Sequence, residues 1–391
     1  MKSPFRKLKA RAFSLILCCA LLLVALPISA GSVTQSAKEA IGVSAKSAVL
    51  MELDDGLVLY GKNADERMGE ASTTKIMTAL VISEMLPLDK VISVPKEAVG
   101  TEGSSVYLRE GELLSVRSLL LALLLESAND AAVALAVAAS GSIASFAELM
   151  NDKAKQLGLT DTHFTNPHGL YDSEHYTTAR ELAVITAQTL KDRRLCEIFA
   201  TKRAQIPLGV TPNTPDGEGV RYLYNHNKML SLYEGAIGVK TGFTKATGRC
   251  LVSAAKRGEM TLICVTLSAP NDWNDHSALL DYGFEHFSRV TLYNKGELRV
   301  SYSLTGGREQ YVTATNSEPL TLTLPKNYDS NSAELKLEFL QRFEFAPVEA
   351  GEQLGNAILR FGDREVCSPL TAAYGVPSVN TRERKRFIFF D

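Results

Sequence analysis

The chain has 391 residues, of which 45% are hydrophobic and 22% are charged. This composition is typical of folded globular proteins and excludes long disordered or fibrous segments, and the length indicates two domains. The formal net charge is −2, so the chain lacks the basic excess of a nucleic-acid-binding protein, and no nucleic-acid partner is expected.

Residues 1–30 have the features of a secretory signal peptide. A positive head is followed by an apolar run over about residues 13–26 and by small residues that end at Ala30. An uncleaved membrane anchor is the alternative, but the run is shorter than the roughly 20 residues that a spanning helix needs. We therefore expect cleavage after Ala30 and an exported, extracytoplasmic protein.

The predicted elements then follow in chain order. A β-hairpin is expected over residues 45–62, where two apolar strands flank the turn Asp54-Asp55-Gly56. Apolar residues at helical spacing predict a series of helices, over about residues 72–86, 115–125, 130–140, 145–157 and 178–190. Three strands and a helix come next, at 236–241, 249–256, 260–268 and 274–287.

Strands at both ends of this region enclose a helical middle, which is an α+β pattern. The first and last strands are expected to share one antiparallel sheet. From about residue 289 the pattern becomes entirely β, because apolar residues alternate with polar ones in several short runs. We expect a first domain over residues 31–290 and a small all-β sandwich over residues 291–380.

Residues 381–391 form a separate tail, in which a basic cluster precedes the aromatic run Phe387-Ile388-Phe389-Phe390. Basic residues attract anionic lipid and aromatic residues insert at the interface, so the tail is a candidate for peripheral membrane contact. A frayed C-terminus is the alternative, and the sequence leaves both open. Neither the cysteines nor the histidines have the spacing of a metal site.

The motif S-x-x-K occurs at three positions, and its context differs at each. Ser93 to Lys96 contains a proline that spoils a helical turn, and Ser253 to Lys256 lies on a predicted strand. Ser72-Thr73-Thr74-Lys75 opens a predicted helix, so that Ser72 and Lys75 share one face. This spacing lets an amine reach a hydroxyl, although an N-cap serine beside a solvated lysine has the same pattern.

Two further motifs favour the interpretation of Ser72 and Lys75 as a reactive pair over that of a helix cap beside a solvated lysine. Ser127-Ala128-Asn129 lies at the junction of two apolar helices, where polar groups can project into a cleft. Lys240-Thr241-Gly242 lies at the end of a predicted strand. Each motif also has an ordinary structural explanation, as a helix cap and a surface turn respectively, but the three occur in the order known for serine acyl transfer on penicillin-type substrates.

In this order and context the motifs resemble those of the serine penicillin-recognising enzymes. The segments around Ser72, Gly103-Ser104-Ser105, Asn166 to Leu170 and Gly238 to Thr244 are similar to the D-alanyl-D-alanine carboxypeptidases, the low-molecular-mass penicillin-binding proteins of serine peptidase family S11. The resemblance covers about residues 40–290, and the trailing β-domain resembles that family's C-terminal domain. It implies a β-lactamase/transpeptidase-like catalytic domain, an antiparallel sheet with a helical subdomain.

The resemblance also implies an activity, namely removal of the terminal D-alanine from peptidoglycan pentapeptide stems through an acyl-enzyme on Ser72. Lys75 would be the base and Ser127 the proton carrier to the leaving amine. Asn129 would hold Lys75 and the substrate amide. Lys240 and Thr241 would bind the terminal carboxylate, Gly242 would leave room for substrate, and the backbone N–H groups of Ser72 and Phe243 would bind the oxyanion.

By this reading the partners are the peptidoglycan pentapeptide and β-lactams, which would acylate Ser72, and the location is the cell wall or the outer face of the cytoplasmic membrane. No metal or organic cofactor is expected.

The alternative functions are a DD-endopeptidase on wall crosslinks, a serine β-lactamase, and a non-catalytic wall-binding or sensor module. The β-lactamase is disfavoured because the chain has no E-x-x-L-N string and carries an extra β-domain. The sequence leaves open the sporulation or vegetative role, the oligomeric state and the role of the β-domain.

Overall fold

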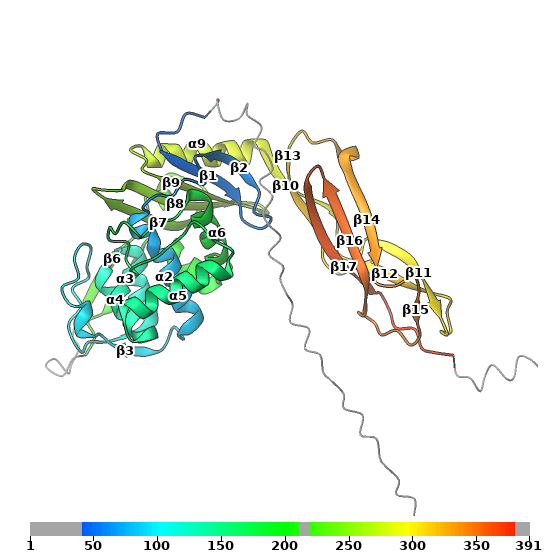
Figure 1. Ribbon diagram of the computed structural model, residues 1–391, viewed down its shortest axis with the longest axis horizontal. Helices are drawn as coiled ribbons and strands as arrows, with labels where there is room; N and C mark the ends of the chain where they lie inside the picture. The colour runs from blue at the N-terminus through cyan, green and yellow to red at the C-terminus, as the bar shows by residue number, and fades with distance from the viewer. Residues whose placement is uncertain (1–40, 211–218, 380–391) are drawn as a thin grey trace, which may run out of the picture.

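The computed structural model describes residues 41–210 and 219–379, so the predicted signal peptide and tail lie outside the described residues. The molecule is elongated, with a mixed helix-and-sheet part at one end and an all-β part at the other (Figure 1). The mixed part precedes the all-β part in the chain, and the α+β prediction is confirmed.

A five-stranded antiparallel sheet in the order β2-β1-β9-β8-β7 is the central layer of the mixed part. The first hairpin of the chain pairs with the last strand of this part, through Val49 opposite Val265. The expected sharing of one sheet by the first and last strands is therefore confirmed. The strands are β1 (Ser47–Glu52), β2 (Val58–Lys62), β7 (Ala236–Thr244), β8 (Gly248–Arg257) and β9 (Met260–Leu267).

Both faces of this sheet are buried, which explains why its strands are apolar throughout. Successive side chains of a strand point to opposite faces. In β1, Ala48 and Leu50 pack with helix α9 (Asp272–His286), whereas Val49 and Met51 pack with the larger helical group. Figure 1 shows α9 on one side of the sheet and helices α2 to α6 on the opposite side.

The helical group contains the five helices that the sequence predicted between residues 72 and 190, and the sixth predicted helix is α9 on the other face. The group begins with the 3₁₀ turn η1 (Ala71–Thr74) and continues with α2 (Lys75–Met85), α3 (Val116–Leu125), α4 (Asn129–Ser140), α5 (Ile143–Gln156) and α6 (Ala179–Thr189). Helices α3 and α4 are almost wholly buried, which agrees with their nearly continuous apolar sequences.

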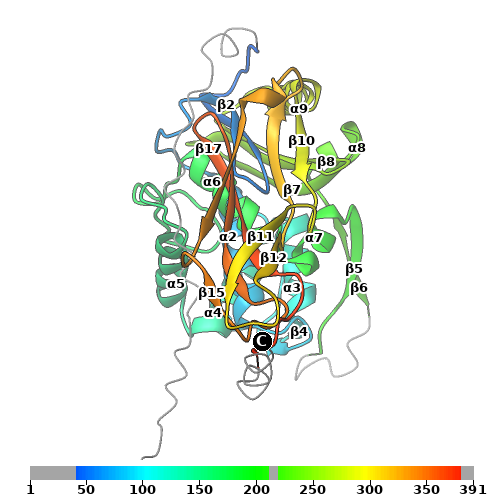
Figure 2. The same cartoon turned by 90° about the vertical axis from the view of Figure 1, so that its right-hand side faces the viewer.

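Several short elements were not predicted, because they are too short or too exposed to carry a clear hydrophobic period. The strand pair β5 (Arg203–Pro207) and β6 (Val220–Tyr224) lies along the outer edge of the helical group and contacts α3 (Figure 2). The others are β3 (Val91–Ser93), η2 (Lys96–Ala98), β4 (Leu113–Ser115), α7 (Arg193–Ala200) and α8 (Met229–Leu232).

The all-β part consists of two sheets that share one core, as the sandwich prediction requires. One sheet pairs β10 (Phe287–Tyr293) with β13 (Leu320–Pro325), and the other has the order β14-β16-β17-β12-β11-β15. Its strands are β11 (Arg299–Thr305), β12 (Tyr311–Asn316), β14 (Ala333–Phe339), β15 (Glu344–Phe345), β16 (Gln353–Phe361) and β17 (Arg364–Ala372), with the short turn η3 (Ser330–Ser332) before β14. Leu322 and Leu324 of the small sheet pack with Leu354 and Leu359 of the large one.

The two parts are joined by β10 and by charged contacts. Phe287 packs against the core below α9, and Val290 packs against the core of the all-β part. Asp55, in the turn between β1 and β2, accepts hydrogen bonds from Thr323 N (2.8 Å) and Arg364 Nη2 (2.6 Å). Within the described residues no single helix is long and apolar enough to span a bilayer, although α4 and α5 reach that length as a pair bent by 82°.

Candidate active site

The S-x-x-K motif at Ser72 lies where a 3₁₀ turn passes into helix α2. Ser72 belongs to η1, and α2 begins only at Lys75, so the helix starts later than the sequence predicts. Ala71 has a φ of +50°, an uncommon value for a residue with a side chain. The expected proximity is present, because Lys75 Nζ lies 2.9 Å from Ser72 Oγ.

Lys75 is completely buried and surrounded by oxygen atoms. Besides Ser72, its Nζ contacts Asn129 Oδ1 at 2.7 Å and the His168 carbonyl oxygen at 2.7 Å. Burial lowers the pKa of Lys75 well below its usual value, and the nearby charge of Lys240 lowers it further, while Asp130 opposes the shift. An unpaired ammonium is costly to bury, so this environment favours the neutral amine.

Ser127 and Asn129 come from the junction of α3 and α4, as the sequence predicts. Both are buried, and Ser127 has a φ of +60°. Asn129 accepts from Lys75 through Oδ1 and donates through Nδ2 to the Glu102 carbonyl at 2.5 Å. Because an amide group has two N–H hydrogens, one donor remains beyond the contact with Glu102.

The K-T-G motif lies on β7, against the turn that carries Ser72. Lys240 is 1% exposed, donates to the Thr241 carbonyl oxygen at 2.9 Å, and has its pKa lowered to about 7 by burial. A Cβ on Gly242 would lie 3.0 Å from both Glu70 O and Ser72 N. The structural reason for glycine is therefore close contact with η1, whereas the sequence analysis had expected it to leave room for substrate.

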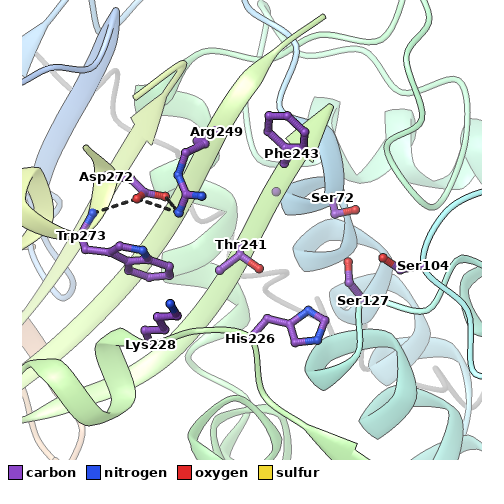
Figure 3. Close-up of a pocket in the computed structure, with 11 residues that line it drawn as sticks. Ser72, Ser104, Ser127, His226, Lys228, Thr241, Phe243, Arg249, Asp272 and Trp273 are labelled. Carbon is purple, nitrogen blue, oxygen red and sulfur yellow. Dashed lines mark hydrogen bonds and ion pairs between the residues drawn. The ribbon is translucent and has the colours of Figure 1, made fainter. Parts of the chain in front are cut away.

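These motifs meet at a pocket of about 400 Å³ (Figure 3). Of the predicted site residues, the pocket wall includes Ser72, Ser127, Thr241, Gly242 and Phe243. Lys75, Asn129 and Lys240 are bonded to this group from behind the wall. The structure thus brings all eight predicted residues together.

The remaining wall residues were not predicted. Arg249 on β8 lies across from Phe243 on β7, where its guanidinium makes two 2.9 Å hydrogen bonds to Asp272 and lies over the ring of Trp273. The other residues are Ser104, His226 and Lys228. A single charged residue within a strand pattern has no distinctive sequence signal, so only the pairing of β7 with β8 reveals Arg249 as part of the site.

The loop around Asn166 to Leu170 supports the Ser72 turn from behind. Its carbonyl oxygen at His168 contacts Lys75, and Asn166 Oδ1 accepts from Gly169 N at 2.7 Å. Burial lowers the pKa of His168 to about 3, so its ring is neutral at ordinary pH. The sequence analysis quoted this segment for its resemblance but assigned it no role.

A second buried network fixes the same turn. His175 Nε2 lies 3.1 Å from Glu70 Oε1 and 2.8 Å from Thr74 Oγ1, and its Nδ1 accepts from Thr165 N at 3.1 Å. The histidine therefore ties the loop to both sides of η1. No group of three or more His, Cys, Asp or Glu side chains within residues 41–210 and 219–379 is arranged to hold a metal ion.

Asp130 of α4 holds the loop between η2 and β4 at the pocket. This carboxylate is 1% exposed and accepts from Ser105 Oγ at 2.6 Å and from Leu108 N at 3.0 Å. Its neighbour Asn129 donates its own backbone N–H to the Ser104 carbonyl at 2.7 Å. The two residues thus position the Ser104 wall of the pocket.

Comparison with known proteins gives the same family along the chain. The family model described as D-alanyl-D-alanine carboxypeptidase, Peptidase_S11, matches residues 33–271. The model for the C-terminal domain of penicillin-binding protein 5 matches residues 287–386.

Individual relatives agree with these matches. The chain is 35% identical to D-alanyl-D-alanine carboxypeptidase DacF of Bacillus subtilis over 338 residues, which is 84% of this chain and 85% of the relative. Among solved structures, penicillin-binding protein 5 of Haemophilus influenzae has a TM-score of 0.70 at 26% identity and covers 86% of this chain and 98% of its own. The Streptomyces K15 DD-transpeptidase has a TM-score of 0.59 at 34% identity, over 62% of this chain and 98% of its own.

The family match extends over more than half of the chain, and the motif residues that carry the resemblance surround one pocket. The chain therefore belongs to the D-alanyl-D-alanine carboxypeptidase family, and it is a serine carboxypeptidase of the penicillin-binding protein type.

Proposed function

We propose that this protein removes the terminal D-alanine from peptidoglycan pentapeptide stems, with Ser72 as the nucleophile. The observation that carries this proposal is the environment of Lys75, since a serine hydroxyl needs a base that can accept its proton. Lys75 Nζ lies 2.9 Å from Ser72 Oγ and is fully buried.

The three neighbours of Lys75 match the hydrogen-bonding capacity of a neutral amine. Asn129 Oδ1 and the His168 carbonyl can only accept, so they take the two N–H hydrogens of an uncharged –NH₂ group. The amine lone pair is then left to take the proton of the Ser72 hydroxyl, whose Oγ lies 2.9 Å from Nζ. The lowered pKa of Lys75 supports the same protonation state.

Attack then proceeds in two stages. Ser72 Oγ bonds to the carbonyl carbon between the two D-alanines while Lys75 takes the proton. The backbone N–H groups of Ser72 and Phe243 stabilise the oxyanion. The amide C–N bond breaks as Ser127 passes a proton to the leaving amine, and water later hydrolyses the ester on Ser72. Asn129 uses its remaining N–H to hold the substrate amide.

The terminal carboxylate of the substrate would lie beside Thr241. Lys240 supplies charge from beneath, Thr241 supplies a hydroxyl donor, and Arg249 supplies a second cation at the rim of the pocket. Arg249 extends the carboxylate site that the sequence analysis assigned to Lys240 and Thr241 alone. A β-lactam carries the same carboxylate and acylates the same serine.

We also infer an extracytoplasmic location, in the cell wall or at the outer face of the cytoplasmic membrane. The basic and aromatic composition of residues 381–391 supports peripheral contact with anionic lipid. Loss of the protein from the membrane fraction when residues 381–391 are deleted would support this contact, and unchanged partitioning would contradict it.

The activity is tested by D-alanine release from a soluble pentapeptide that ends in D-Ala-D-Ala, with the chain from residue 31 and its Ser72→Ala variant. We expect release and penicillin labelling with the first protein and neither with the second. Thr73→Ser, which alters the adjacent buried hydroxyl residue but keeps the hydroxyl, is the control that should retain activity. Labelling of the Ser72→Ala protein would refute Ser72 as the nucleophile.

A further inference from the structure

The residue directly before the proposed nucleophile is held in an uncommon backbone conformation. Ala71 is buried and has a φ of +50°, in the left-handed region that residues with a Cβ adopt at a cost. Such a conformation persists only where the surrounding contacts enforce it. Because Ala71 precedes Ser72, its backbone angles set the direction of the Ser72 N–H and side chain. The contacts that hold Ala71 therefore bear on catalysis.

The hydroxyl of Thr74 reaches back to Ala71 from the end of the same turn. Thr74 Oγ1 lies 2.7 Å from the Ala71 carbonyl oxygen. The same hydroxyl lies 2.8 Å from His175 Nε2 and 3.1 Å from Glu70 Oε1. Thr74 and Glu70 are completely buried, and hydrogen bonds are stronger in such a low-dielectric environment than in water.

The direction of these hydrogen bonds follows from the ring of His175. Its Nδ1 accepts from Thr165 N at 3.1 Å, so Nε2 carries the ring hydrogen. This Nε2–H faces Thr74 Oγ1 and Glu70 Oε1, which both accept from it. The single hydrogen of the Thr74 hydroxyl then points to Ala71 O, the nearer of its two oxygen neighbours. A relay of hydrogen bonds thus runs from the Thr165 backbone to Ala71.

Glu70 is an expensive component of this relay. Its side chain is fully buried, and Oε2 has no hydrogen-bond partner within residues 41–210 and 219–379. Burial of a carboxyl group with one oxygen unsatisfied costs free energy, and such a group calls for an explanation. The other oxygen, Oε1, holds the His175 N–H and the Thr74 hydroxyl at one point. The retained cost is therefore tied to the relay.

An ordinary helix contact does not account for this arrangement. Threonine in a helix often donates to a carbonyl three or four residues earlier. Thr186 in α6 does so, with Oγ1 2.7 Å from Leu182 O, and its hydroxyl makes no second hydrogen bond among the described residues. Thr74 differs because its oxygen is also contacted by His175 and Glu70, and because its acceptor belongs to a residue with positive φ.

We propose that Thr74 is a positioning residue for catalysis, oriented by His175 and Glu70. Its hydroxyl holds Ala71 in the left-handed conformation and thereby keeps the hydroxyl and the N–H of Ser72 in place. This inference rests on the proposed function, because it takes Ser72 as the nucleophile. The relay makes and breaks no covalent bond. It controls the rate of ester formation rather than the strength of noncovalent binding, which depends on the pocket wall.

The test measures the rate constant of acylation in single turnovers with saturating fluorescent penicillin. This first-order constant does not depend on the fraction of the protein that is folded, so a loss of stability alone does not change it. With the chain from residue 31, Thr74→Val should acylate at least about tenfold more slowly, because a small displacement of the nucleophile is costly. Thr74→Ser keeps the hydroxyl and should stay within about threefold of the unaltered protein.

Thr186→Val is the matched control, because it removes a buried threonine hydroxyl that donates to a helix carbonyl but belongs to no relay. Its acylation rate constant should also stay within about threefold, and the dissociation constant of the noncovalent penicillin complex should be similar in all the variants. If Thr74→Val does not fold, Thr74→Ala removes the same hydroxyl with less bulk beside His175.

A glycine at position 71 tests whether Thr74 acts through the backbone. Glycine adopts positive φ without the cost that a Cβ imposes. The A71G/T74V double variant should therefore recover at least about fivefold of the rate that T74V loses, while A71G alone stays within about threefold of the unaltered protein. Loss of a hydroxyl with a purely structural role would not be rescued in this way.

Other results overturn the inference. Normal acylation by T74V, slow acylation that A71G does not restore, or an equal loss in T186V would each show that Thr74 does not position Ser72 through Ala71. If the unaltered protein is not acylated at all, the proposed function fails, and a crystal structure of T74V decides the inference separately. Ala71 with an unchanged positive φ would refute the relay, whereas a negative φ would support it.

Discussion

Gly169 packs directly against the carbonyl oxygen of Ala71, the residue before the proposed nucleophile. A Cβ at this glycine would lie 1.9 Å from Ala71 O, and its φ of +83° disfavours any side chain. The loop that supplies the His168 carbonyl to Lys75 is therefore in contact with the Ser72 turn as well. The position of the nucleophile and the position of its base depend on one close backbone contact.

This contact predicts that Gly169→Ala is strongly damaging. The left-handed backbone and the steric overlap should together lower the free energy of unfolding by at least about 2 kcal/mol. D-Alanine release should fall at least tenfold in the protein that remains folded, because the shifted turn separates Ser72 from Lys75. Gly258→Ala is the matched control, since Gly258 has a φ of +58° but no atom within 4 Å of its added Cβ. Equal effects of the two substitutions would show that the contact with Ala71 is unimportant.

The two buried lysines predict a bell-shaped pH dependence of kcat/KM. Activity should rise with pH as Lys75 loses its proton, an event that its lowered pKa moves toward neutral pH. Activity should fall again as Lys240, whose pKa burial lowers to about 7, loses the charge that attracts the carboxylate. Because the two groups interact, both limbs describe the pair rather than single residues.

Initial rates between pH 5 and 10 test this profile, with Lys240→Arg as the diagnostic variant. Arginine stays charged throughout this range, so the pH profile of the Lys240→Arg variant should lack the alkaline limb. The alkaline limb of kcat should also lie at higher pH than that of kcat/KM, since bound carboxylate stabilises the Lys240 charge. A rate that climbs steadily to pH 10 in the unaltered protein would contradict a charged role for Lys240.

From the burial of His276 we expect the free energy of unfolding to decrease in acid. Its ring is fully buried between Ser253 Oγ (2.5 Å) and Thr266 Oγ1 (2.9 Å), and burial lowers its pKa to about 3. The unfolded chain binds a proton at this residue near pH 6.5, whereas the folded chain does not. The stability associated with the neutral ring is therefore complete above pH 6.5 and decreases as the pH falls toward 3, by ~5 kcal/mol at most.

Urea unfolding at pH 7, 6, 5 and 4 measures this effect by comparison with His276→Gln. The variant should be less stable at pH 7, but its stability should decline less steeply in acid, because one group that takes up a proton on unfolding is gone. Parallel curves for the two proteins would mean that another group titrates in place of His276.

We expect Asp55 to hold the mixed part and the all-β part of the molecule together. Its side chain is only 15% exposed and holds both Arg364 and the backbone of Thr323 in β13. Asp55→Ala leaves the Arg364 charge and the Thr323 N–H without their acceptor, so the junction should loosen by ~1–3 kcal/mol. Small-angle scattering should then report a broader range of inter-domain distances, while pentapeptide hydrolysis stays within about twofold.

Asp363→Ala is the control for this experiment, because it removes a carboxylate from the neighbouring β16–β17 turn, and that carboxylate has no hydrogen bond or ion pair among the described residues. Identical scattering from the two variants would show that Asp55 does not hold the parts together.

The sequence alone determined the order of the main helices and strands, the α+β class and the eight motif residues that meet at the pocket. These depend on local information: strand and helix periods in the apolar residues, and short motifs whose spacing places two side chains on one face. The elements that the sequence analysis did not predict were missed for local reasons as well. Strands β5 and β6 were missed because short, largely exposed segments carry little periodic signal, and helix α7 was missed because its 8 residues make only about two turns. The 3₁₀ form of the Ser72 turn was missed because S-x-x-K spacing is compatible with either helix type.

Only the tertiary structure decided the electrostatics of the site. The environment of Lys75 combines α2, the α3–α4 junction, the His168 loop and β7, and its lowered pKa results from burial that no local segment can produce. Arg249, the Gly169 contact and the relay from His175 to Thr74 likewise depend on which segments the fold places side by side. Sequence motifs name the reacting groups, but the desolvation and charge that set their protonation states arise from long-range packing.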